Sequence, residues 1–167
     1  MFDLAIKIDK SCGAMQGKTP AAVQSALDGF VTEATMFLLA EVKKRTPQGA
    51  SPVGANLLAS ELATVSGKGT PLVKGEVASA HQYAEVIEKG RTAGKAMPPS
   101  GVLVRWLEVK LGLDAATAKR VEFVVRRKIG AKGFPGRHMF EKSVTENQGA
   151  LDAMAERYGL MIATELQ

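Results

Sequence analysis

The feature that most constrains the fold is a long apolar stripe at helical spacing between Thr19 and Lys44. Its members lie three or four residues apart, as on one face of a helix, and are Val23, Leu27, Phe30, Ala34, Phe37 and Ala40. Thr19 followed by Pro20 predicts the helix start, because a hydroxyl caps the first turn and proline fits the first helical position. A helix of this length needs another layer to cover its stripe, so we expect it to form the spine of the fold, with Phe30 in the core.

Three segments have strand character and predict that layer. From Phe2 to Asp9 apolar and polar residues alternate, as in a half-buried strand. Residues 61–66 and 72–78 flank the glycine-containing loop 67–71, which is typical of a β-hairpin. The sequence therefore predicts an α+β fold in which the long N-terminal helix packs on a small antiparallel sheet, with additional C-terminal helices.

The second half of the chain is predicted to be mainly helical. Apolar spacing indicates helices over 102–111 and 115–129. Gly112 is expected to end the first of these and Asp114 to cap the second. A further apolar stripe over 151–162 predicts a C-terminal helix.

Three other segments have less distinctive patterns. Residues 56–63 suit either a short turn of helix or the entry to a strand, residues 81–89 suit a short helix or an extended edge, and residues 137–144 are predicted as a strand. At 167 residues the chain has the length of one domain. We expect residues 1–167 to form a single domain, with a helical insertion at about 100–130.

The composition excludes several classes of protein. Hydrophobic residues make up 46% and charged residues 23%, which is ordinary for a folded soluble protein. The most apolar stretch, 34–40, is far shorter than the roughly 18 residues that span a bilayer, so no membrane partner is expected. No secretory signal is visible, and the chain is expected to be made and kept in a cytoplasm. Cys12 is the only cysteine, which excludes an internal disulfide and a cysteine zinc site from this chain alone.

The segment 13–19, GAMQGKT, comes close to a phosphate-binding loop between a strand and a helix. Such a loop needs four residues between its first glycine and the Gly-Lys-Thr, whereas only three intervene here. At the required spacing stands Cys12, whose side chain takes space that the tight loop keeps open for backbone amides. We therefore expect an ordinary loop, with no nucleotide and no other cofactor.

The remaining catalytic patterns are also incomplete. His81 and His138 lie far apart, without the spacing of a metal-binding helix, and both are expected to be structural. Glu85 and Glu88 fall on what is predicted to be a solvated helix face, and no serine nucleophile motif is present. We expect a protein that is not an enzyme and has no catalytic, cofactor or metal site.

The positive charge of the chain is concentrated in one region. Residues 119–142 hold eight basic and two acidic residues, a net charge of +6, whereas the whole chain carries +5. The helix pair at 102–129 could be a helix-turn-helix whose residues 126–128, Arg-Arg-Lys, meet phosphates. Those cations lie at the C-terminal end of the second helix, while residues 115–118, AATA, offer little that reads bases. Nucleic-acid binding is therefore the alternative to a structural role in which the cations face solvent or another subunit.

Several motifs occur in a distinctive order. The long helix runs into 43–47, KKRTP, and a Pro-Gly loop is followed by 56–60, NLLAS. Residues 83–90, YAEVIEKG, precede a helix with Trp106, and 133–140, GFPGRHMF, close the set. In order and spacing these segments resemble the head-tail joining, or tail-completion, proteins of tailed bacteriophages, also described as minor tail protein Z-like.

The resemblance extends from the long helix to the C-terminus, and it departs from the family pattern at two places. Val53-Gly54-Ala55 stands where the family usually has Asp-Thr-Gly, and His138-Met139 stands where a proline is common. The resemblance implies a small α+β subunit without enzymatic activity. It implies a homo-oligomeric ring of about six or about twelve copies at the phage neck or tail top.

Such a ring would join head to tail and leave a channel through which genomic DNA passes without sequence-specific binding. Its partners would be its own copies and adjacent neck, portal-side adaptor or tail proteins, in a virion assembled in the host bacterial cytoplasm. The expected subunit or partner interface comprises Arg126, Arg127, Lys128, Lys132, Arg137, Tyr83, Glu88 and Phe140.

Overall fold

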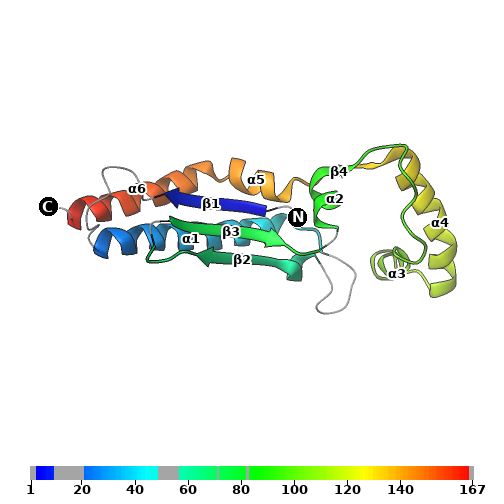
Figure 1. The fold of residues 1–167 in the computed structure, drawn as a ribbon. Helices are drawn as coiled ribbons and strands as arrows, with labels where there is room; N and C mark the ends of the chain where they lie inside the picture. The colour runs from blue at the N-terminus through cyan, green and yellow to red at the C-terminus, as the bar shows by residue number, and fades with distance from the viewer. Residues whose placement is uncertain (1–2, 10–20, 49–56, 71, 82, 166–167) are drawn as a thin grey trace. The chain divides into compact units, whose positions relative to one another are not determined.

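The structure is a computed structural model that describes residues 3–9, 21–48, 57–70, 72–81 and 83–165 (Figure 1). The chain forms two compact units. Of the described residues, the sheet unit takes those up to Arg45, Glu61–Ala78 and those from Met139 onward, and the helical unit takes those in Thr46–Ser60 and Ser79–His138. The expectation of a single domain with a helical insertion stays a prediction.

Among the described residues, the sheet unit contains three strands and three helices. Its strands are β1 (Asp3–Asp9), β2 (Glu61–Ser66) and β3 (Leu72–Ser79), in the order β1-β3-β2. β1 is antiparallel to β3, with Asp3 opposite Ala78 and Asp9 opposite Leu72. Its helices are α1 (Ala21–Arg45), α5 (Met139–Thr145) and α6 (Gln148–Glu165). Figure 1 shows the three strands side by side with α1 running along them, which confirms the predicted α+β fold.

Helix α1 buries more than the single stripe that the sequence suggested. It contacts β1 and β2 and also α5 and α6, so side chains on two of its sides are covered. Its buried apolar residues are Val23, Ala26, Val31, Ala34, Leu38 and Val42. Phe30 is only half-buried, and its ring meets the Tyr158 ring edge-on at a centroid distance of 6.0 Å. The prediction that Phe30 lies in the core was therefore wrong, because the buried face is turned toward Val31 and Leu38.

A glycine on the central strand lets α1 approach the sheet. A Cβ atom at Gly75 would lie 1.9 Å from the Thr35 hydroxyl oxygen and 3.0 Å from a Val31 methyl carbon. The same hydroxyl donates a 2.6 Å hydrogen bond to the Val31 carbonyl, which satisfies it in the core. Any larger residue at this position would have to push the helix away from the strand.

Glu41 is a buried carboxylate near the end of α1. It is 8% exposed, and it accepts hydrogen bonds from Arg45 Nη1 at 2.6 Å and from Lys44 Nζ at 2.5 Å. Arg45 also pairs with Glu146, which follows α5, at 2.7 Å. The hydrogen bonds from Arg45 and Lys44 lower the pKa of Glu41 to about 2. This network ties the end of α1 to the α5–α6 connection.

Replacing this carboxylate, by Glu41→Gln, is expected to lower the free energy of unfolding at neutral pH by about 1–3 kcal/mol. Because the pKa of Glu41 falls from 4.5 to about 2 on folding, its contribution is full above pH 4.5 and is lost as the pH drops toward 2. Urea unfolding of both proteins at several pH values measures this. Glu85→Gln, at an exposed position outside this network, is the control and should change stability by less than about 0.5 kcal/mol. Equal loss of stability on acidification in wild type and Glu41→Gln would contradict the prediction.

The helical unit is built around two packed helices, α3 (Val104–Leu111) and α4 (Ala115–Lys132). Leu107 and Ala118 are fully buried between them. Gly112 ends α3 in the left-handed conformation, with φ 64°, and the Asp114 carboxylate caps α4 by accepting from two backbone amides at 3.0 and 3.1 Å. The predicted helix pair and both of its caps are confirmed.

The remaining elements of the helical unit are short. They are the 3₁₀ turn Leu58–Ser60, helix α2 (Ala84–Lys89) and the two-residue strands β4 (Gly90–Arg91) and β5 (Phe134–Pro135), which pair antiparallel. These elements decide the two segments for which the sequence allowed either of two structures. Residues 56–63 contain the turn and then enter β2, and residues 81–89 contain a helix.

The prediction of a strand over 137–144 was wrong. Most of that segment is α5, in which Met139, Phe140 and Ser143 are buried. Those positions follow helical spacing, and the Ser143 hydroxyl donates to the Met139 carbonyl four residues earlier. Because Glu141, Lys142 and Ser143 follow Met139 and Phe140, the sequence shows no apolar stripe at helical spacing here. The predicted C-terminal helix is confirmed as α6.

Candidate interaction surface

The predicted basic residues divide into two groups in the structure. Arg127, Lys128, Lys132 and Arg137 have exposed side chains, as an interface with another molecule requires. Arg126 is half-buried, and its Nε donates a 2.6 Å hydrogen bond to the Pro98 carbonyl. Arg126 thus holds the loop that contains Pro98 against α4 within the same unit.

The three predicted interface residues outside the basic group also differ from one another. Tyr83 is 49% exposed, with its ring 5.5 Å from that of His81. Phe140 and Glu88 are 0% and 2% exposed, so neither offers surface to a partner. The prediction that Glu88 lies on a solvated helix face was wrong, because it shares the buried side of α2 with Ala84, one turn earlier.

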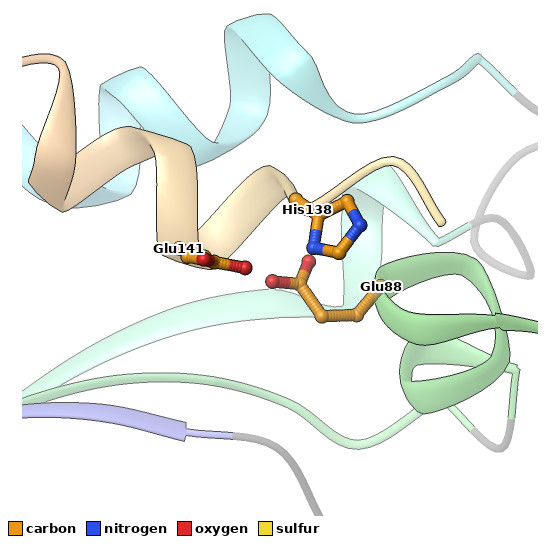
Figure 2. A group of neighbouring side chains, drawn as sticks. All are labelled: Glu88, His138 and Glu141. Carbon is orange, nitrogen blue, oxygen red and sulfur yellow. The ribbon is translucent and has the colours of Figure 1, made fainter. Parts of the chain in front are cut away.

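Glu88 lies beside His138 in the helical unit (Figure 2). A carboxylate oxygen and a ring nitrogen of the pair come within 4.8 Å, and the His138 backbone N–H donates to the Glu88 carbonyl at 3.1 Å. His138 has φ 53°, a conformation that a non-glycine residue adopts only where its surroundings fix it. Glu141, also drawn in Figure 2, belongs to α5 of the sheet unit. Glu88 and His138 are the donors of this group that belong to the helical unit, whereas a zinc site has three or four ligands.

Helix α4 carries an outer face that the sequence pattern did not reveal. Arg120, Phe123, Val124 and Arg127 follow one another at helical spacing, and all four are exposed. Phe123 is 54% and Val124 is 64% exposed, whereas Ala118 and Glu122 are buried. Large apolar side chains beside arginines are typical of the residues that anchor protein interfaces. We call these four residues the α4 outer face.

The helical unit also has an apolar pocket of about 480 Å³. Its apolar lining includes Val86, Ile87, Pro98, Val102, Trp106 and Phe134. Arg91 and Arg105 supply guanidinium groups at its wall, and none of the described lining residues is a carboxylate. The pocket can receive apolar side chains, and His81 and Tyr83 also line it.

Strand β2 forms an edge of the sheet, since among the described strands only β3 lies beside it. Its sequence, ELATVS, contains no lysine, arginine or proline, and Leu62 is 61% exposed. Natural edge strands usually carry such residues because they prevent pairing with another strand. Among the described residues, β2 is therefore an edge to which a strand from another chain can add.

Some features predicted from the sequence fall on residues that the structure does not describe. They are the near-miss loop 13–19, the Thr19-Pro20 helix start and Cys12.

Across the described ranges, no helix has both the length and the apolar character needed to cross a membrane. Comparison of the chain with protein-family models, curated proteins and solved structures gives no match.

Proposed function

We propose that this protein is a structural subunit of a tailed bacteriophage particle, which forms a homo-oligomeric ring at the neck or tail top and joins head to tail. The order of motifs along the chain supports this proposal, and the α+β fold with α1 packed along an antiparallel sheet is compatible with it. In this role the protein binds other protein chains and leaves a channel for DNA. Its role is to assemble with other copies and with neighbouring proteins of the particle.

The observation that carries the proposal is the unprotected β2 edge. An edge strand with no lysine, arginine or proline presents a row of backbone N–H and C=O groups that another strand can pair with. Strand addition supplies main-chain hydrogen bonds, and exposed Leu62 adds apolar contact. A neighbouring copy in a ring is the partner that is always present at high local concentration.

Placing lysines on this strand, by Leu62→Lys with Thr64→Lys, is expected to abolish or weaken assembly at least about tenfold, because charged edges resist pairing. Light scattering across a concentration series measures the mass of the particle. Met36→Lys is the matched control, since Met36 is a 55% exposed apolar residue on α1 and its replacement should leave assembly intact. Unchanged assembly of the folded double-lysine variant would remove the β2 edge from the interface.

The second candidate function is nucleic-acid binding, favoured by the exposed cations Arg127, Lys128, Lys132 and Arg137. The first turn of α4 remains AATA, which has no side chain suited to reading base edges. Wild-type binding to a DNA duplex at two salt concentrations separates the candidates. Tight binding that falls by about one power of salt concentration per phosphate contact, by a chain that stays monomeric, would favour this alternative.

A further inference from the structure

We propose that, in addition to the pairing at the β2 edge, neighbouring copies join head to tail through two complementary helix faces, with α6 of one copy docking on the α4 outer face of the next. This inference rests on the proposed function and names the surfaces that a self-assembling ring would use. The occupant of the α4 outer face is a second copy of this chain. The reasons lie in the charge and apolar content of the two helices.

The first surface combines apolar and cationic side chains. On the α4 outer face, Phe123 and Val124 lie between Arg120 and Arg127. Helix α4 contains six basic residues and one acidic residue, a net charge of +5. That single acid, Glu122, is 4% exposed and accepts from the Leu103 backbone N–H at 3.1 Å, so it does not neutralise the outer face. A partner of this face should be apolar and acidic.

The second surface has that composition. Asp152, Glu156 and Leu160 follow one another at steps of four residues along α6, and all three are exposed. Leu160 is 69% exposed, the largest exposed fraction among the large apolar residues that the structure describes. Helix α6 contains three acidic residues and one basic residue, a net charge of −2. We call Asp152, Glu156 and Leu160 the α6 outer face.

The outer face of α6 is fixed by contacts on its other side. Helix α6 packs on α1, and its half-buried residues are Leu151, Met154, Tyr158 and Ile162. Glu33 of α1 accepts hydrogen bonds from the Tyr158 hydroxyl at 2.9 Å and from Arg157 Nη2 at 2.5 Å. Arg157, the only cation of α6, is thereby engaged within its own unit. The α6 outer face is exposed, while the half-buried residues lie on the other side of the helix.

The charges favour a head-to-tail contact over a symmetric one. Two α4 outer faces would bring four arginines together, and two α6 outer faces would bring four carboxylates together, so like pairings are disfavoured. Pairing unlike faces joins arginines to carboxylates around a shared apolar centre. When two copies join through unlike surfaces, each of them keeps one surface free to bind a further copy. Repeating this contact gives a closed ring if the rotation between successive copies brings the last copy back to the first.

The test uses two variants of the full chain. The α4 variant carries Phe123→Asp with Val124→Asp, and the α6 variant carries Glu156→Lys with Leu160→Lys. Each alone is expected to require at least about tenfold higher concentration to assemble than wild type. Mixed together they should form 1:1 pairs, because each retains the surface that the other lacks. Circular dichroism confirms folding, and native mass spectrometry counts the copies.

A charge exchange provides the rescue. Arg120→Glu with Arg127→Glu should weaken assembly, and adding Asp152→Lys with Glu156→Lys to the same chain should restore it. If the wild type assembles but the α6 variant assembles equally well, this inference is overturned while the proposed ring function stands. If the wild type remains monomeric at all concentrations, the ring function and this inference both fail.

Discussion

Leu38→Asp is expected to leave no folded soluble protein. Leu38 lies on the inner face of α1 and is 2% exposed, so the substitution places an unpaired charge in the core of the sheet unit. Burying such a charge costs several kcal/mol, against a total stability of about 5–15 kcal/mol for a domain. Soluble yield and the circular dichroism spectrum of the purified protein measure the effect.

Two substitutions on the same helix serve as controls. Met36 is 55% exposed, so Met36→Asp should change the free energy of unfolding by less than about 0.5 kcal/mol. Phe30→Asp should be intermediate, because Phe30 is half-buried and loses its edge-on contact with Tyr158. A Leu38→Asp protein as stable as Met36→Asp would show that the inner face of α1 has been assigned to the wrong residues.

Leu107→Ala is expected to destabilise the helical unit by about 2–5 kcal/mol. Leu107 is fully buried where α3 packs on α4, and truncation leaves a cavity that the short helix α3 cannot easily close. A unit of this size has few other buried apolar side chains to compensate. Hydrogen exchange should therefore accelerate most at the amides of α3 and α4.

Leu111→Ala is the matched control, since Leu111 is 55% exposed at the end of the same helix. It should leave hydrogen exchange in α4 unchanged. If Leu107→Ala and Leu111→Ala affected exchange equally, α3 would not be held on α4 through Leu107.

The elements that the sequence predicts well are those set by local chemistry. The hairpin follows from β-branched residues around a glycine loop, and the α3–α4 pair follows from Gly112 and the Asp114 cap, whose partners are a few residues away. The strand β1 follows from simple alternation. Each of these patterns is complete within about twenty residues, so no knowledge of distant contacts is needed.

Features that depend on distant contacts were not predictable. The sheet covers one side of α1, and helices α5 and α6, more than ninety residues later in the chain, cover another. Glu88 is hidden although its sequence context suits a solvated helix, and Arg126 reaches Pro98, 28 residues away. The sequence indicated the basic character of α4, but only the structure shows that Phe123 and Val124 face outward between two arginines.

The central claim is that the chain assembles into a closed ring, and the mass of the wild-type particle in solution tests it most directly. Native mass spectrometry or sedimentation velocity on the purified full chain should give one discrete species of about six or about twelve times the chain mass of 17.7 kDa. Its size should stay constant once assembly is complete, because a closed ring has no free ends. A chain that stays at 17.7 kDa at every concentration, or that grows without limit as a filament, would contradict the account.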